Sequence, residues 1–142
     1  MIGVDLDGTL AILNPMPKSL RKRFLTGDER RLKIRLYKQY REEAILNEAM
    51  KKGLDGQDYY IITGRRPKWQ DLTIKWLSDN GLNPLGVFFF DEKEKTREEI
   101  IKYKARLIKN LNITTYYEDD EKVVEGLRNL CPKTQILFPK LS

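Results

Sequence analysis

The residues with the clearest chemical potential are two aspartates near the start of the chain. Residues 1–10 read MIGVDLDGTL, with Asp5 and Asp7 separated by one apolar residue. The alternating apolar residues before Gly8 predict a short buried strand that ends in a loop. Side chains alternate between the faces of a strand, so Asp5 and Asp7 are expected to point the same way. Two neighbouring carboxylates at the end of a buried strand need a partner, and a divalent cation is the simplest one.

Residue composition limits the chemistry that can accompany these aspartates. The sequence has no histidine and a single cysteine, Cys131. Histidine catalysis and histidine metal ligation are therefore excluded, which leaves carboxylates, lysine, hydroxyls and backbone amides. Oxygen donors favour magnesium over zinc. One cysteine cannot form an intrachain disulfide, and we interpret Cys131 as a small buried thiol.

Length and hydropathy indicate one globular domain over residues 1–142. Hydrophobic residues make up 40% of the chain and charged residues 34%, which is typical of a soluble protein. No apolar run reaches the roughly 20 residues of a membrane span. Met1 leads directly into the predicted strand and leaves no room for a signal peptide. We therefore expect a cytoplasmic protein with no membrane partner.

The net charge of +6 is concentrated in one segment. Between Lys18 and Arg41 ten basic residues face only Asp28 and Glu29. Apolar residues recur every four positions in this region, and a capping-box pattern precedes them, so we predict a helix over residues 28–50 with a cationic face. Such a face can serve solubility alone, or it can attract a polyanionic substrate.

The rest of the chain alternates between predicted strands and helices. The apolar strands are expected at residues 59–63, 85–90, 113–117 and 134–138. Helices are expected from Pro67 to Asn80, from a capping box at Thr96 to Leu111, and after Glu121. This alternation predicts a parallel sheet with helices on both faces. An insert at residues 15–54, directly after the first strand, would lie at the carboxyl ends of the strands, where ligands bind.

The segment Asp5-Leu6-Asp7-Gly8-Thr9 resembles the first motif, Asp-x-Asp-Gly-Thr, of the haloacid dehalogenase (HAD) superfamily of phosphohydrolases. In that motif the first aspartate is the nucleophile and the second is the general acid/base. The resemblance therefore implies these roles for Asp5 and Asp7. A hairpin tip at Asp7-Gly8 is the alternative for an isolated match, so the later motifs must decide.

Two further segments are similar to the second and third motifs of the superfamily. Thr63 ends the second predicted strand, although a threonine there is ordinarily a cap, and the resemblance implies that it holds a phosphate oxygen. Gly64 and Arg65 follow it, where backbone amides and a guanidinium group could also meet phosphate. Lys104 matches the motif-three lysine, which neutralises the nucleophile and the phosphate, and Lys102 is the alternative.

The acidic run at residues 118–121 resembles the fourth motif, whose acids complete a magnesium site. Alignment on the valines that follow makes Glu118 and Asp119 the pair, with Asp120 as a further candidate for the ligand. The usual pair is two aspartates, so Glu118 departs from the pattern. Glu121 is better explained by the dipole of the following helix. The resemblance implies that Mg²⁺ is bound by Asp5, by the motif-four acids and by the backbone carbonyl of Asp7.

Together the four motifs imply a fold and an activity. The superfamily has an α/β, three-layer, Rossmann-like core with a five-stranded parallel sheet in the order 5-4-1-2-3, and residues 15–54 would form a small helical cap insert. The implied activity is magnesium-dependent hydrolysis of a phosphomonoester through an aspartyl-phosphate. The small architecture is also similar to the phosphatase half of polynucleotide kinase-phosphatases, which suggests a nucleotide or a polynucleotide phosphate end as substrate. A small sugar or nucleoside phosphate is the alternative.

Two classes of protein without hydrolase activity also combine some of these features. Phosphoacceptor receiver domains carry their acid pair after the first strand and the phosphorylated aspartate after the third. Here the Asp-x-Asp motif follows the first strand and the acid pair follows the fourth, which speaks against a receiver. A catalytically silent nucleic-acid-binding protein rests on the basic segment and would show a steep salt dependence of binding.

Overall fold

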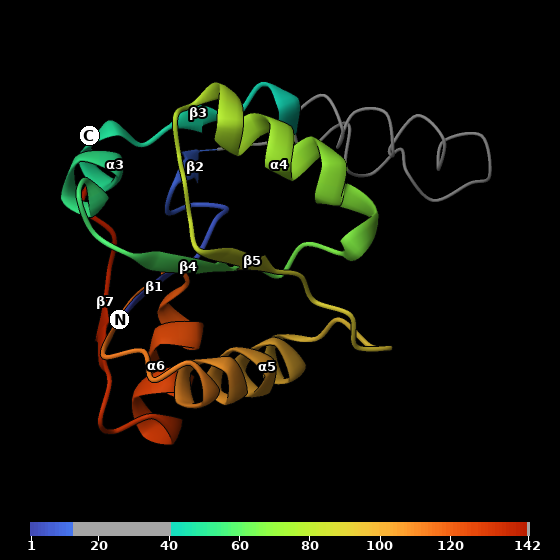
Figure 1. The fold of residues 1–142 in the computed structure, drawn as a ribbon. Coiled ribbons are helices and arrows are strands. Elements are labelled where there is room, and N and C mark those ends of the chain that lie inside the picture. Colours follow the sequence, from blue (N-terminus) through green and yellow to red (C-terminus); the bar gives the residue numbers. More distant parts are fainter. Residues whose placement is uncertain (13–40, 142) are drawn as a thin grey trace.

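A parallel sheet forms the centre of the fold (Figure 1). The computed structural model describes residues 1–12 and 41–141. Within these residues the main sheet has five strands in the order β5-β4-β1-β6-β7. The strands are β1 (Ile2–Val4), β4 (Tyr59–Ile62), β5 (Gly86–Phe88), β6 (Thr115–Tyr117) and β7 (Gln135–Leu137). Counted along this sheet, the order is the predicted 5-4-1-2-3, and every neighbouring pair is parallel.

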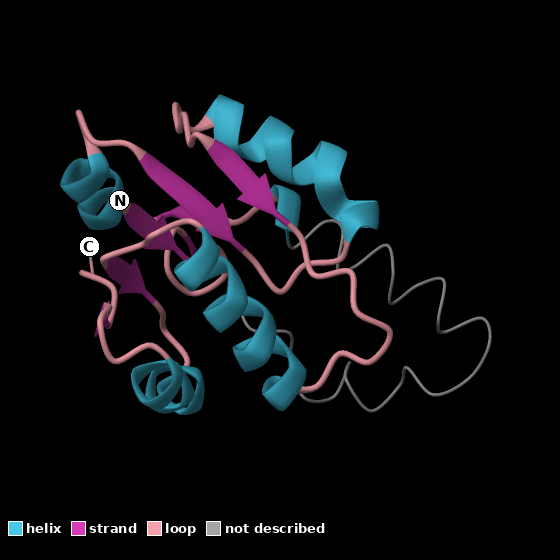
Figure 2. Cartoon of the chain, turned by 60° about the horizontal axis from the view of Figure 1, so that its bottom comes forward, coloured by secondary structure: helices cyan, strands magenta, loops and turns pink. Residues whose placement is uncertain are grey.

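Helices cover both faces of this sheet (Figures 1 and 2). On one side lie α3 (Glu48–Leu54) and α4 (Gln70–Asp79), the latter preceded by the 3-10 turn η1 (Pro67–Trp69). On the other side lie α5 (Arg97–Asn110) and α6 (Glu121–Leu130). Strands buried on both faces explain why the strand segments read as nearly continuous apolar runs. No helix among the described residues is both long and apolar enough to cross a membrane.

Each face of the sheet packs its own hydrophobic core. The core under α3 and α4 includes Val4, Leu6, Met50, Leu54 and Trp76. The core under α5 and α6 includes Ile62, Phe90, Ile108, Tyr116, Leu127 and Cys131. The Cys131 thiol is buried, as predicted. These two cores hold the sheet rigid from both sides, which fixes the loops that leave its carboxyl end.

Local capping signals set the ends of the helices largely as predicted. The Thr96 hydroxyl accepts a hydrogen bond from the Glu99 N–H at 3.2 Å and begins α5. Helix α4 ends at Asp79 with Asn80 as its C-cap, and Gly81 follows with a φ of 68°. Glycine adopts this left-handed conformation without a steric penalty, so it is a favourable residue after a helix end.

The predicted helix over residues 28–50 is wrong in its last part. Residues 28–40 lie outside the described residues. After Glu42 the chain forms the strand β3 (Ile45–Leu46), which pairs antiparallel with β2 (Ala11–Ile12). Asn47 then caps the separate helix α3 by accepting a hydrogen bond from the Met50 N–H. The β2 backbone and the Asn47 cap thus override the four-residue apolar period that suggested one continuous helix.

Candidate active site

The candidate site lies where three neighbouring strands of the sheet end. β1 pairs with β4 on one side and with β6 on the other. Asp5 directly follows β1, Thr63 follows β4 and Glu118 follows β6. Parallel strands end at the same edge, so these three residues meet there, as the predicted strand order requires. Figure 2 shows the strand arrows pointing toward this edge.

A buried lysine connects the acids at this edge. Lys104, on α5, donates to Asp5 Oδ1 at 2.9 Å and to Glu118 Oε1 at 2.5 Å. All three side chains are buried. The other oxygen of Glu118 accepts backbone N–H groups from Asp119 and Asp120 at 3.1 and 3.3 Å, which fixes the carboxylate. Of the two predicted lysines, Lys104, the preferred one, is therefore the one that reaches the acids.

Lys102, the alternative, lies elsewhere. Its ammonium is exposed and pairs with Glu98 at 3.3 Å and with Glu99 at 3.7 Å on its own helix. Such exposed pairs contribute little to stability. The two lysines differ by half a helical turn, which turns one toward the sheet and the other toward solvent.

Three carboxylates form a group that could hold a metal ion. Asp5, Glu118 and Asp119 each offer an oxygen, and these oxygens lie within 4.8 Å of one another. Asp120 instead caps α6 by accepting from the backbone N–H groups of Lys122 and Val123. The carboxylate donors fit a hard cation such as Mg²⁺. The predicted contribution of the Asp7 backbone carbonyl stays a prediction.

Burial and crowding shift the protonation of this group. Burial raises the pKa of Asp5 to about 7, while Lys104 opposes the shift and Glu118 adds to it. Burial, followed by Asp5, raises the pKa of Asp119 to about 6. Burial lowers the pKa of Lys104, but Asp5 and the other nearby anionic groups raise it by more. The pKa of Lys104 therefore lies well above its usual range. Three neighbouring carboxylates and one ammonium leave an excess of two negative charges when all are ionised, which one divalent cation would balance.

Gly8 allows the two acidic loops to approach each other. Its φ is 84°, and a Cβ at this position would lie 1.9 Å from Asp119 Oδ2. A side chain is therefore excluded both by conformation and by space. The parallel pairing of β1 on both sides also shows that Asp7-Gly8 is not the tip of a hairpin within the sheet. The Thr9 hydroxyl, which sequence reasoning did not assign to the site, donates to Asp5 Oδ2 at 3.4 Å.

Asp7 has a different partner from Asp5. The Arg65 guanidinium binds it bidentately, with Nε 2.9 Å from Oδ2 and Nη2 2.6 Å from Oδ1. Arg65 also donates from Nη1 to the hydroxyl of Thr73 on α4 at 2.9 Å. Arg65 is 2% exposed, whereas the Asp7 side chain is 31% exposed. The structure therefore directs Arg65 to Asp7, and its predicted contact with phosphate stays a prediction.

Thr73 is a functional contact that the sequence did not reveal. It lies on the apolar stripe of α4 and is fully buried. The sequence gives no signal for its role, because the spacing of Thr73 indicates only packing. Its hydroxyl orients the arginine that orients Asp7.

Thr63 and Gly64 line the same cavity as Asp5 and Asp7. The Thr63 hydroxyl accepts the Arg65 N–H at 3.1 Å, which leaves its own proton available to a further acceptor. Thr63 is buried, and its N–H donates to the Phe88 carbonyl of β5. A Cβ at Gly64 would lie 3.9 Å from Cε of Lys95. The Lys95 side chain therefore extends close to Gly64 at this cavity.

An open cavity of about 540 Å³ joins these residues. Its lining includes all the predicted site residues of the first four motifs: Asp5, Asp7, Thr63, Gly64, Arg65, Lys104, Glu118 and Asp119. A larger cavity of about 710 Å³ lies at the opposite edge of the sheet, around Ile113, Cys131 and Lys133. The acidic group thus opens into the smaller of these two cavities.

Comparison with known proteins shows the fold. No protein-family model and no curated protein sequence matches the chain. A chain in the structure of the Pnkp1/Rnl/Hen1 RNA repair complex has a TM-score of 0.65 and 16% identity, covering 98% of this chain. The present chain spans only 41% of the length of that chain.

In two further solved structures the match extends over most of the matched chain. A HAD-superfamily hydrolase, subfamily IA, variant 1, from Geobacter sulfurreducens PCA has a TM-score of 0.58 and 12% identity, covering 99% of this chain and 88% of its own. A haloacid dehalogenase-like hydrolase from Streptococcus pneumoniae has a TM-score of 0.57 and 16% identity. The match covers 96% of the present chain and 82% of the hydrolase chain. The chain therefore has a HAD-like hydrolase fold, which confirms the predicted resemblance at the level of the fold.

Proposed function

We propose that this chain, which has a HAD-like hydrolase fold, is a magnesium-dependent phosphomonoester hydrolase. The observation that carries the proposal is a group of three neighbouring carboxylates at the carboxyl end of the sheet, two of which pair with one buried lysine. Asp7 stands beside this group, held by Arg65. Phosphoryl transfer needs positioning and charge neutralisation more than covalent chemistry from the protein. This arrangement supplies both.

Asp5 is the nucleophile in this proposal. Its carboxylate attacks the phosphorus, a bond forms between the carboxylate oxygen and phosphorus, and the bond to the leaving alcohol breaks. The product of this step is an aspartyl-phosphate on Asp5. Lys104, 2.9 Å from Asp5, reduces the repulsion between the anionic nucleophile and the anionic phosphate.

Asp7 is the general acid and then the general base. As a carboxylic acid it gives its proton to the leaving alcohol oxygen. As a carboxylate it then takes a proton from the water that attacks the aspartyl-phosphate, which releases phosphate and restores Asp5. Such a role contributes about 10²–10⁴-fold in rate. The bidentate contact with Arg65 holds the Asp7 carboxylate in one orientation for the second step, in which it is the base.

The transferred phosphate is bound from the other strand ends. Thr63 and Gly64 line the cavity, and in this proposal the Thr63 hydroxyl and the Gly64 backbone N–H donate to the phosphate oxygens. Asp5, Glu118 and Asp119, with the Asp7 carbonyl, would hold Mg²⁺. When bound there, Mg²⁺ would supply electrostatic stabilisation of the phosphate oxygens.

The proposed substrate is a nucleotide or a polynucleotide phosphate end. The basic segment at residues 18–41 supports this class, as does the similarity to a chain of an RNA repair complex. A cap formed by residues 15–54 is part of the same proposal. A small sugar or nucleoside phosphate is the second candidate substrate, because the cavity of about 540 Å³ is large enough for one.

Phosphate release with and without magnesium tests the proposal. The panel comprises p-nitrophenyl phosphate, mononucleotides, sugar phosphates and oligonucleotides with 3′- or 5′-phosphate, and Asp5→Asn is the control. Release that requires both magnesium and Asp5 is the expected result, and the preferred substrate names the class. Substantial turnover by Asp5→Asn would contradict the nucleophile assignment. Silence across the panel, with salt-sensitive oligonucleotide binding, would favour the binding protein instead.

A further inference from the structure

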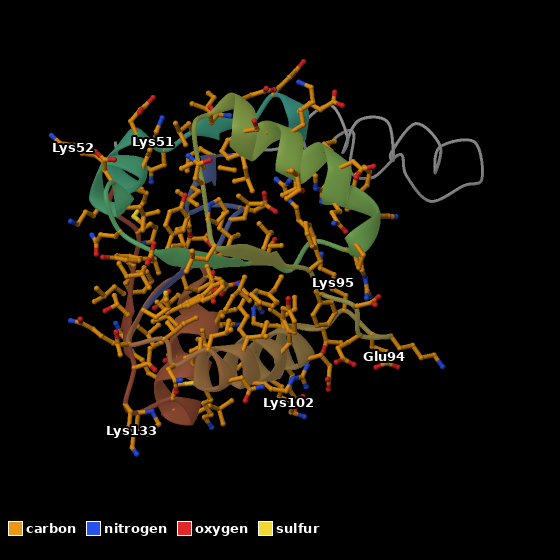
Figure 3. The ribbon with its side chains drawn as sticks, viewed as in Figure 1. Lys51, Lys52, Glu94, Lys95, Lys102 and Lys133 are labelled. Carbon is orange, nitrogen blue, oxygen red and sulfur yellow. The ribbon has the colours of Figure 1, made fainter. Side chains whose placement is uncertain are left out.

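Lys95 occupies a distinctive position at the rim of the candidate active site. It lies in the loop between β5 and α5 and lines the same cavity as Asp5 and Thr63. Its stem passes over Gly64, with Cε 3.9 Å from the place a Cβ would take there. Figure 3 shows Lys95 on the side of the loop that faces η1 and the start of α4, with Glu94 on the opposite side. Lys95 is thus an exposed residue that lines the rim of the site.

The Lys95 ammonium differs in its pairing from the other cations that line the cavity. Four cationic side chains line the cavity. Arg65, Arg97 and Lys104 each pair with a carboxylate at 2.5–3.3 Å. Among the residues the structure describes, Lys95 is the member of this group that pairs with no carboxylate. An unmatched ammonium at the rim of a cavity is a binding group for an anion.

The loop that carries Lys95 is held in place. Arg66 donates from Nη1 to the Glu92 carbonyl and from Nη2 to the Lys93 carbonyl at 3.4 Å, and its guanidinium lies 5.0 Å from the centre of the Phe90 ring. Arg106 on α5 pairs with the Glu92 carboxylate at 3.3 Å. These contacts fix the backbone on which Lys95 stands, so an anion bound there does not have to order the loop first.

The surroundings of Lys95 identify which part of a substrate it faces. Partial burial and then the nearby Arg41 lower the pKa of Lys95, while Asp7 opposes them. Arg66 and Arg65 act in the same direction as Arg41. The Lys95 stem lies over Gly64, which directly precedes the arginine that binds Asp7, so Lys95 lies on the Asp7 side of the cavity. In the proposed reaction Asp7 protonates the leaving oxygen, so groups on its side face the leaving alcohol.

We propose that Lys95 binds a second anionic group of the substrate, carried on the alcohol that leaves. This inference rests on the proposed hydrolase function and makes its substrate class narrower. The substrates it favours are phosphomonoesters whose alcohol carries another phosphate, either as a nucleoside bisphosphate or as the phosphorylated end of an oligonucleotide. Lys95 is then a specificity-determining residue, and Lys104 serves the phosphate that reacts.

Binding in an Asp5→Asn background tests the role of Lys95 without turnover. The ligands are adenosine 3′,5′-bisphosphate and the two matched monophosphates, measured by titration calorimetry in the presence of Mg²⁺. Lys95→Ala is expected to raise the Kd of the bisphosphate about tenfold and those of the monophosphates less than twofold. Lys93→Ala, an equal charge change in the same loop, is the control and leaves all three unchanged. Lys95→Arg is expected to keep the preference for the bisphosphate.

Two results would overturn the inference. One is an unchanged Kd for the bisphosphate in Lys95→Ala, and the other is an equal loss for all three ligands, which would place Lys95 on the reacting phosphate. A dinucleotide with a 3′-phosphate, added as a fourth ligand, distinguishes an oligonucleotide end from a free bisphosphate. Whichever of these two ligands loses more affinity in Lys95→Ala is the one whose second phosphate Lys95 binds.

Turnover separates this inference from the proposed function. With Asp5 present, Lys95→Ala is expected to raise KM for the preferred ligand and to leave kcat and the hydrolysis of p-nitrophenyl phosphate unchanged. Absence of phosphate release from every substrate would contradict the proposed function. The binding comparison between Lys95→Ala and Lys93→Ala still decides the role of Lys95 in that event.

Discussion

The two sides of the candidate site have opposite charge balances. The carboxylate side consists of Asp5, Glu118, Asp119 and Lys104, where three acids lie together and one ammonium pairs with two of them. The arginine side consists of Asp7, Arg65 and Lys95, where one acid lies with two cations at the lining of the cavity. Asp5 and Asp7 are two residues apart on the same loop, yet each belongs to a different side.

This difference assigns different ligands to the two sides. An excess of carboxylates is unfavourable in a buried site unless a cation joins it, so the carboxylate side fits a divalent metal. An excess of cations fits an anion, so the arginine side fits a phosphate group of the substrate. Reaction at the boundary between them would place the phosphorus between a nucleophile near the metal and an acid near the leaving group.

The largest expected effect of breaking the arginine side is on turnover by Asp7→Asn. An amide cannot give or take the proton, so kcat is expected to fall about 10²–10⁴-fold for an alkyl phosphate such as a mononucleotide. The loss should be smaller for p-nitrophenyl phosphate, because p-nitrophenolate leaves without protonation. Steady-state kinetics with both substrates measures the two losses. Equal losses of kcat/KM, which reports the steps up to the departure of the alcohol, would contradict the assignment of Asp7 as the acid.

The sequence predicted the carboxylate side better than the arginine side. Asp5, Lys104 and the pair Glu118 and Asp119 each lie at a strand end or on the helix that a motif indicates. Strand order then brings them together, and strand order follows from the alternation of elements together with the HAD resemblance. The sequence did not predict that Lys104 is buried and Lys102 is exposed, which only the structure shows.

The arginine side depends on contacts between distant elements, which a single sequence does not encode locally. Arg65 looked like a phosphate ligand beside Thr63, but its guanidinium reaches Asp7 and the hydroxyl of Thr73. The strand β3 was missed for a related reason, since its partner β2 is remote in sequence. Apolar periodicity predicts helices well only where no backbone partner competes.

Magnesium is expected to stabilise the protein through the carboxylate side. Folded Asp5 keeps its proton up to a pH of about 7, whereas the usual pKa is 3.8, so folding takes up protons between these values. Without metal, the free energy of unfolding therefore falls as the pH rises from about 4 to 7. Asp119, with a pKa of about 6, acts in the same direction, although its exposure weakens the effect.

Urea unfolding with and without MgCl₂ at pH 7.5 and pH 5 measures this linkage. At 100 times its Kd, magnesium at pH 7.5 is expected to add about 2.7 kcal/mol to the free energy of unfolding. At pH 5 protons compete with the metal and the gain should be smaller. NaCl at equal ionic strength is the control, and Asp119→Asn should reduce the gain. The same gain at both pH values would contradict a metal site at these acids.

The same substitution on the two sides should change stability with opposite signs in the absence of metal. At pH 8, Asp7→Asn removes the charge that the buried Arg65 guanidinium faces, and we expect the free energy of unfolding to fall by about 2 kcal/mol. This loss is smaller than that for a fully buried pair, because Asp7 is 31% exposed and asparagine keeps one acceptor. Asp5→Asn removes one of three crowded negative charges while keeping an oxygen acceptor for Lys104, so we expect a gain of about 1 kcal/mol. Urea unfolding of both variants in EDTA measures the difference. Losses of similar size in both would show that the charge excess on the carboxylate side is not a source of instability, and would remove the electrostatic reason for placing the metal there.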